Sequence, residues 1–98
     1  MAKTQNETLI RRAVAGELRR AGWFVFYNMQ SFGSYKGVAD LTAMRDGKVV
    51  FVECKTETGK QSPDQVQFQR DCETHGVEYY LARGPEDVRP LLNSVPLF

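Results

Sequence analysis

Three charged residues of this sequence are spaced so that they could bind a divalent cation and hydrolyse a phosphodiester. Asp40 begins one predicted strand, and Glu53 and Lys55 end the next one along the chain. In a strand over Lys48–Lys55, the period of two places Glu53 and Lys55 on one face, while Cys54 points the other way. Two carboxylates bind a hard cation through oxygen, and a neighbouring lysine can position the attacking water. The spacing therefore indicates a metal-assisted hydrolytic site.

A Glu-x-Lys triplet alone is more often the ordinary end of an exposed strand than part of a site. Here the triplet follows the apolar run Val49–Val52, which is the part of the chain most expected to be buried. Charged groups in a buried position need partners or a function. With Asp40 on the neighbouring strand, the pattern favours a functional site over the structural alternative.

The elements that must position these residues can be read from the spacing of apolar residues and from turn signals. Asp46-Gly47 is a strong signal for a hairpin turn, and Ser62-Pro63 is typical of a helix start. The expected elements are a helix at Gln5–Ala21, strands at Trp23–Met29, Asp40–Met44 and Lys48–Lys55, a helix from Ser62 to about Gly76, a strand at Val77–Ala82 and a short helix at Pro85–Leu92. This order, α-β-β-β-α-β-α, predicts the α/β class, with a mixed sheet flanked by helices and a hairpin in its middle.

Two further polar residues lie on helix faces that should pack against the sheet. Glu7 shares a face with the apolar residues of the first helix, and Gln65 lies on the inner face of the second. Each residue also fits a capping box, Thr4 with Glu7 and Ser62 with Gln65. Helix capping and a role in the site are about equally supported, and one side chain can serve both.

Composition and charge narrow the class of protein. The 98 residues suit one domain spanning the whole chain, and no apolar run approaches the length of a membrane span. No signal-peptide pattern begins the chain, so we expect a cytoplasmic protein. The two cysteines have no metal-ligand spacing, so zinc is not expected. Residues 1–36 hold six basic and two acidic side chains, which suits phosphate contacts or equally a solvated helix face.

Other residues that could do chemistry have simpler interpretations. His75 precedes Gly76 and is expected to be a helix-end residue rather than a base. The loop before the aspartate holds side chains that either contact phosphate or form a plain surface: Ser31, Ser34, Tyr35 and Lys36. The aromatic residues of the first predicted strand are expected to fill the core rather than stack on bases: Trp23, Phe24, Phe26 and Tyr27.

Three segments together resemble a known family. Gly37-Val38-Ala39-Asp40, Phe51-Val52-Glu53-Cys54-Lys55 and Ser62-Pro63-Asp64-Gln65 are similar to the motifs of the VRR-NUC family, a branch of the PD-(D/E)xK nuclease superfamily. The resemblance implies a restriction-endonuclease-like fold and covers nearly the whole chain. One departure is Ala39, where the family usually has a proline that shapes the backbone and supplies no chemistry.

The resemblance also implies roles for individual residues. The metal ligands would be Asp40, Glu53 and the backbone carbonyl of Cys54, with Glu7 contacting the metal through water. Lys55 would be the catalytic lysine, and Gln65 the glutamine that characterises this branch. The cofactor would be Mg²⁺, for which Mn²⁺ can substitute. Contacts to DNA are expected from Arg11, Arg12, Ser31, Ser34 and Lys36.

The expected function is that of a magnesium-dependent endonuclease acting on branched DNA such as a Holliday junction. Standalone domains of this family occur in phages and bacteria, which implies the cytoplasm of a bacterial or phage-infected cell and a homodimer without membrane contact. Flap cleavage and non-specific DNA cleavage remain open alternatives on the same fold. A non-catalytic nucleic-acid-binding module is a further alternative, although the intact Asp40, Glu53 and Lys55 argue against it.

Overall fold

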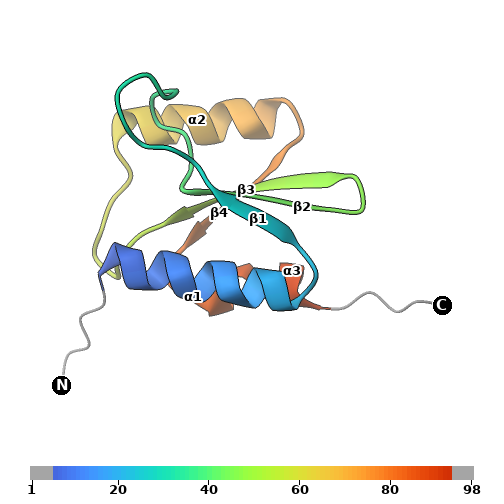
Figure 1. Cartoon of the computed structure of the whole chain (residues 1–98). Helices are drawn as coiled ribbons and strands as arrows, with labels where there is room; N and C mark the ends of the chain where they lie inside the picture. Colours follow the sequence, from blue (N-terminus) through green and yellow to red (C-terminus); the bar gives the residue numbers. More distant parts are fainter. Residues whose placement is uncertain (1–5, 94–98) are drawn as a thin grey trace.

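Four strands form one mixed sheet in the computed structural model of the chain, which describes residues 6–93. The order across the sheet is β1-β2-β3-β4; the first three strands are antiparallel and β4 runs parallel to β3. The strands are β1 (Phe24–Tyr27), β2 (Leu41–Arg45), β3 (Lys48–Cys54) and β4 (Glu78–Ala82). The helices are α1 (Glu7–Arg20), α2 (Pro63–Thr74), the 3-10 helix η1 (Pro85–Val88) and α3 (Arg89–Leu92). The sheet lies between α1 and α2 (Figure 1), and the predicted order of elements is confirmed.

The main core fills the space between the sheet and α1. Its apolar side chains come from α1, all four strands and the C-terminal helical turns; the fully buried ones include Val14, Leu18, Leu41, Val50, Val52 and Val88. The indole nitrogen of Trp23 donates to the carbonyl oxygen of Leu91 at 2.8 Å, so the one polar atom of this buried ring is satisfied. This packed layer fixes α1 against the strands that carry the candidate site.

A tight hairpin joins β2 to β3. Asp46 and Gly47 both have positive φ, 52° and 81°, as a type I′ turn requires. The turn sets a register in which Leu41 pairs with Val52. Because Asp40 directly precedes Leu41 and Glu53 directly follows Val52, the hairpin brings these two acidic residues to the same end of the sheet.

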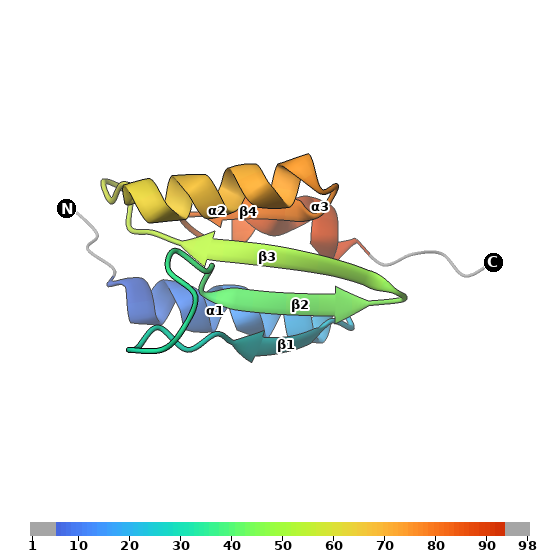
Figure 2. The same cartoon turned by 90° about the horizontal axis from the view of Figure 1, so that it is seen from above.

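The other face of the sheet is covered only in part. On α2, Phe68 packs edge-on against Phe51, with ring centres 5.1 Å apart, and its ring centre lies 6.2 Å from that of Tyr79. Figure 2 shows α2 beside β4 and the edge of β3, with no helix over β1 and β2 on that side. The uncovered strands expose Phe24, Phe26, Met44 and Val49.

The prediction that the aromatic residues of the first strand fill the core is therefore correct only for Trp23. Phe24 is 64% exposed, and Phe26 and Tyr27 are also exposed. The physical reason is that β1 is an edge strand with a helix on only one of its faces, so that its inward position is taken by Val25. A strand pattern alone does not reveal whether both faces of the sheet are covered.

None of the helices in residues 6–93 has the length and apolarity that a membrane crossing requires.

Candidate active site

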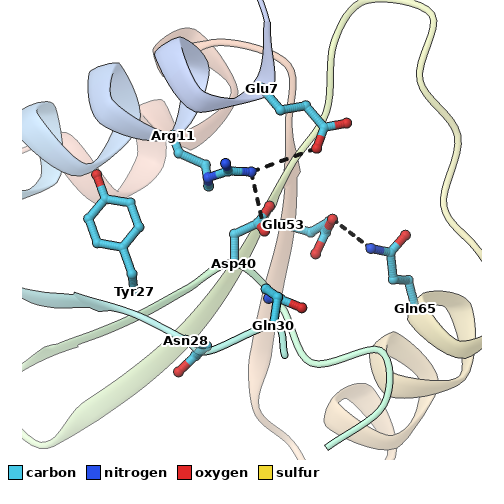
Figure 3. Close-up of a pocket in the computed structure, with 8 residues that line it drawn as sticks. All are labelled: Glu7, Arg11, Tyr27, Asn28, Gln30, Asp40, Glu53 and Gln65. Carbon is cyan, nitrogen blue, oxygen red and sulfur yellow. Dashed lines mark hydrogen bonds and ion pairs between the residues drawn. The ribbon is translucent and has the colours of Figure 1, made fainter. Parts of the chain in front are cut away.

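A pocket opens at the end of the sheet where β1 and β3 end and β2 begins. Its volume is about 450 Å³. Figure 3 shows the side chains that line it, which come from α1, the β1–β2 segment, the hairpin and the start of α2: Glu7, Arg11, Tyr27, Asn28, Gln30, Asp40, Glu53 and Gln65. The pocket thus joins both predicted carboxylates to the two polar residues predicted from the helix starts.

Glu53 is the most deeply buried acid of this pocket, with 1% of its surface exposed. Its Oε2 accepts a hydrogen bond from Gln65 Nε2 at 2.9 Å and lies 3.6 Å from Lys55 Nζ. Its Oε1 is buried and has no hydrogen-bond partner within the described residues. Burial, and then the charge of Asp40, raise the pKa of Glu53 to about 7. An orphaned carboxylate oxygen in a buried position is costly unless a ligand completes its contacts.

Asp40 is held by the neighbouring strand. Its Oδ2 accepts a hydrogen bond from the backbone N–H of Cys54 at 2.8 Å. Its Oδ1 lies 3.7 Å from the guanidinium of Arg11. Burial raises the pKa of Asp40, and the Cys54 N–H and the Arg11 charge offset part of that shift. The pocket thus contains two buried carboxylates, and one oxygen of Glu53 has no partner within the described residues.

The number and type of these ligands suit a magnesium ion that keeps several waters, rather than a metal held entirely by protein side chains. Within residues 6–93, no three or more His, Cys, Asp or Glu side chains are grouped so as to hold a metal by themselves. Glu7 lines the same pocket, but its carboxylate faces the guanidinium of Arg11 at 3.7 Å (Figure 3). Magnesium commonly takes one or two carboxylates and keeps several waters. The roles of Glu7 and of the Cys54 carbonyl as metal contacts stay predictions.

Lys55 and Cys54 take the opposite orientations that the strand pattern predicts. The ammonium group of Lys55 lies beside Glu53, and only 11% of its side chain is exposed. The side chain of Cys54 is fully buried in the core on the α1 side. Burial raises the pKa of the Cys54 thiol to about 12, so the thiol is protonated at neutral pH.

Gln65 forms the predicted cap of α2 and also contacts Glu53, while its role in catalysis stays a prediction. The side-chain Oε1 of Gln65 accepts a hydrogen bond from the backbone N–H of Ser62 at 2.8 Å. The backbone N–H of Gln65 donates to the Ser62 hydroxyl at 3.1 Å, which completes a capping box. Its Nε2 donates at the same time to Glu53. The capping box expected for Glu7 is wrong, because Asn6 is the N-cap of α1 and Glu7 is the first helical residue.

Gly37 brings the β1–β2 segment against the start of α2. It has a φ of 81°, and a Cβ at this position would lie only 2.2 Å from the carbonyl oxygen of Asp64 and 2.9 Å from the backbone nitrogen of Gln65. Only glycine fits such a contact with a positive φ. The glycine of the sequence motif therefore positions two segments, because it lets the loop pack directly against the helix that carries Gln65.

The residues predicted to contact DNA occupy different environments. Arg11 lies inside the pocket between Glu7 and Asp40. Arg12 and Lys36 are exposed. The hydroxyl of Ser34 donates to the carbonyl oxygen of Ser31 at 2.6 Å and so stabilises the loop itself. Arg12 and Lys36 are consequently the freest of these side chains to contact phosphate.

Sequence reasoning missed three residues that line the pocket: Tyr27, Asn28 and Gln30. The side-chain N–H groups of Asn28 and Gln30 donate to the carbonyl oxygen of Ala39 at 2.9 Å and 3.3 Å. The backbone N–H of Asn28 donates to the carbonyl oxygen of Asp40 at 2.8 Å. A possible signal was the pair of amide side chains directly after a strand, but it becomes informative only once β1 is known to pair with β2.

Comparison with solved structures shows a structural likeness. No family model matches the sequence, and no curated protein matches it either. Among solved structures, the chain is similar to one described as a VRR_NUC domain, with a TM-score of 0.74 and 22% sequence identity. The match covers 88% of this chain and 92% of the other. The resemblance noted from the sequence motifs is confirmed at the level of the fold: this chain has the fold of a VRR_NUC domain.

Proposed function

We propose that this protein is a magnesium-dependent DNA endonuclease that acts as a homodimer on branched DNA such as a Holliday junction. The observation that carries the proposal is the buried Oε1 of Glu53, which has no partner within the described residues and lies in a pocket shared with Asp40. A divalent cation would supply the missing contact and neutralise charge on a phosphate. The nuclease-domain fold agrees with this chemistry.

The residues of the candidate site have distinct roles in this proposal, and they include Lys55, which contacts Glu53 without lining the pocket itself. A magnesium ion held by Asp40 and Glu53 would act as a Lewis acid on the scissile phosphate. Lys55, beside Glu53, orients the attacking water and stabilises its hydroxide form. Gln65 fixes one oxygen of Glu53 and leaves the other free to bind. The Cys54 N–H fixes Asp40 in the same way, so both carboxylates are oriented before a metal arrives.

The proposed preference for branched DNA rests on how little of this domain can read base edges. Two of its exposed cations, Arg12 on α1 and Lys36 in the β1–β2 segment, suit phosphates and carry no sequence information. A small basic surface that contacts phosphates selects substrates by shape. Cleavage of flaps, or of duplex without preference, is the competing substrate class.

The proposed homodimer has a candidate surface in the uncovered part of the sheet. Phe24, Met44 and Val49 are paired neighbours across β1, β2 and β3, and Phe26 lies 5.6 Å from Phe24 between ring centres. We call these four exposed apolar residues the open sheet face. The edge of β1 is a less suitable contact, because the Arg19 guanidinium donates to the carbonyl oxygen of Val25 at 2.8 Å. We therefore propose that two copies associate face to face.

Cleavage assays test the enzymatic part of the proposal. The full chain is incubated with a four-way junction, a flap and a linear duplex of matched sequence, each in magnesium, manganese or EDTA. The proposal predicts cleavage of the junction in either metal and none in EDTA. Equal rates on all three substrates would contradict the branched-DNA preference, and DNA binding without any cleavage would indicate the non-catalytic module instead.

Light scattering tests the dimer. The wild-type chain should have twice the mass of one 11.2 kDa copy at micromolar concentration. Met44→Glu places a charge in the centre of the open sheet face and should give a monomer, while Glu57→Lys, an equally exposed change elsewhere, should leave the dimer intact. A wild-type chain with the mass of a single copy would refute the homodimer without affecting the nuclease proposal.

A further inference from the structure

The β1–β2 segment holds one aromatic ring with no protein contact. Phe32 is 104% exposed, which is more than the same residue shows in an extended chain. Met29 and Tyr35 in the same segment are 69% and 66% exposed. A phenylalanine ring in water is unfavourable, and a ring this exposed has no role in stabilising the fold.

Hydrogen bonds and a close backbone contact nevertheless hold the segment that contains Phe32. Its start is anchored by the hydrogen bonds of Asn28 to the backbone of Ala39 and Asp40. A turn follows, in which the backbone N–H of Ser34 donates to the carbonyl oxygen of Ser31 at 3.0 Å. Gly37 packs its end against α2. Phe32 is thus presented at a defined place.

That place is beside the candidate active site. Gln30 lines the pocket, and Phe32 is two residues further on, so the two Cα atoms lie within about 7 Å of each other. Figure 2 shows the segment curling over the end of the sheet at which α1 and α2 begin. One strand of duplex DNA advances about 3.4 Å per nucleotide. A strand whose phosphate lies in the pocket beside Gln30 would therefore have a nucleotide about two steps along near Phe32.

The chemistry of the segment suits nucleic acid. Residues 28–39 include Lys36, two serines and two glycines, and no acidic residue. A neutral to basic loop with an exposed aromatic ring is the arrangement that stacks on bases in single-stranded DNA, because every base has a π face. Bases inside a continuous duplex are already stacked on each other and are not accessible in this way.

We propose that Phe32 stacks on a base that is unpaired or unstacked next to the scissile phosphate, and that this contact selects DNA with a branch or a frayed end. The inference rests on the proposed nuclease function and specifies how its substrate is recognised. Phe32 then acts in substrate selection, while Asp40, Glu53 and Lys55 carry out the hydrolysis.

A fluorescent base tests the stacking contact directly. In the Lys55→Met background, which prevents cleavage, the full chain is titrated in magnesium with a four-way junction carrying 2-aminopurine at the branch. A duplex with the same label serves as the reference. Stacking on Phe32 should quench the junction label. Phe32→Leu, which keeps an apolar side chain without a π face, should lose the quenching and bind the junction about tenfold more weakly, whereas Phe32→Trp should keep both.

The duplex should bind equally to the Lys55→Met chain with Phe32, with Phe32→Leu or with Phe32→Trp. The melting temperatures of these three proteins should agree because Phe32 is fully exposed. Unchanged quenching by Phe32→Leu, or equal weakening for junction and duplex, would overturn the stacking contact. Cleavage by the chains with intact Lys55 separates this result from the function itself. A wild-type chain that cuts no DNA refutes the nuclease proposal, whereas a Phe32→Leu chain that cuts and keeps junction preference refutes only the role of Phe32.

Discussion

The amide group of Gln65 joins the start of α2 to the buried carboxylate of Glu53. Its oxygen accepts from the backbone N–H of Ser62 at 2.8 Å, and its nitrogen donates to Glu53 Oε2 at 2.9 Å. One side chain thus caps a helix and orients a carboxylate. Any change at this position acts on both helix stability and the geometry of the pocket, and the two effects can be separated by the choice of substitution.

Gln65→Glu should preserve the cap but impair cleavage. A glutamate keeps an oxygen for Ser62, but its second oxygen faces Glu53 without an N–H to donate, which places two carboxylates in contact. We expect a rate loss of about tenfold or more. Gln65→Ala should lose activity and also about 1 kcal/mol of stability. Gln67→Glu adds the same charge on the exposed side of α2 and should cleave normally. Normal cleavage by Gln65→Glu would assign Gln65 to capping alone.

Single replacement of the central residues should abolish cleavage and leave the fold intact. Asp40→Asn, Glu53→Gln and Lys55→Met keep the size of each side chain while removing its charge. Loss of this charge stabilisation should lower the rate about a hundredfold or more. Circular dichroism checks the fold of each variant. The matched controls Glu57→Gln and Lys60→Met alter exposed residues of the segment after β3 and should cleave at the wild-type rate. A Lys55→Met enzyme as fast as wild type in magnesium would refute the proposed role of Lys55.

The metal-free protein should lose stability as the pH rises. The pKa of Glu53 goes from an ordinary 4.5 in the unfolded chain to about 7 in the folded protein, and that of Asp40 is raised as well. At a pH between 4.5 and about 7, Glu53 of the folded protein keeps a proton that the unfolded chain has released. The free energy of unfolding therefore falls with increasing pH. Thermal melts in EDTA from pH 5 to pH 8 should show this fall. Glu53→Gln should flatten it, and an equally steep fall in that variant would show that Glu53 is not its source.

Arg11 should compete with a bound cation. Its guanidinium lies 3.7 Å from Asp40 Oδ1 and 3.7 Å from Glu7 Oε1, so it neutralises charge at the place where a metal would. Arg11→Ala should therefore bind manganese several-fold more tightly in the absence of DNA, because a like charge is removed. Calorimetry measures this affinity. Arg12→Ala, an exposed change one residue away, should have no such effect. Equal or weaker manganese binding by Arg11→Ala would contradict the competition.

The sequence predicted those parts of the fold that depend on local signals. Asp46-Gly47 predicted the hairpin turn, and Ser62 with Gln65 predicted the capping box; both are present. The alternation of Glu53 and Lys55 with Cys54 predicted their opposite faces, because a strand has a strict period of two. The helix at the C-terminus was predicted as one element, whereas the structure divides it into η1 and α3.

Features that depend on distant packing were not predicted. Within residues 6–93, no helix covers the face of β1 that points away from α1, and the resulting exposure of Phe24 is encoded by no local pattern. Arg11 was expected to contact DNA, but its guanidinium lies in the pocket beside Asp40, a contact between α1 and the start of β2 that no local pattern encodes. The glycine of the first motif was recognised, but its close contact with Asp64 joins segments far apart in the sequence.

The local hairpin between β2 and β3 has a consequence for how the chain folds. Asp40 contacts the Cys54 N–H across a separation of 14 residues closed by a tight turn, whereas β4 reaches β3 only after the crossover through α2. Short loops close faster than long ones, so we expect the hairpin to form first and the docking of α2 to come late. The two carboxylates are then already adjacent while still hydrated, and their loss of water coincides with α2 docking. Magnesium should accordingly slow unfolding, because it stabilises a contact that is completed only when α2 docks.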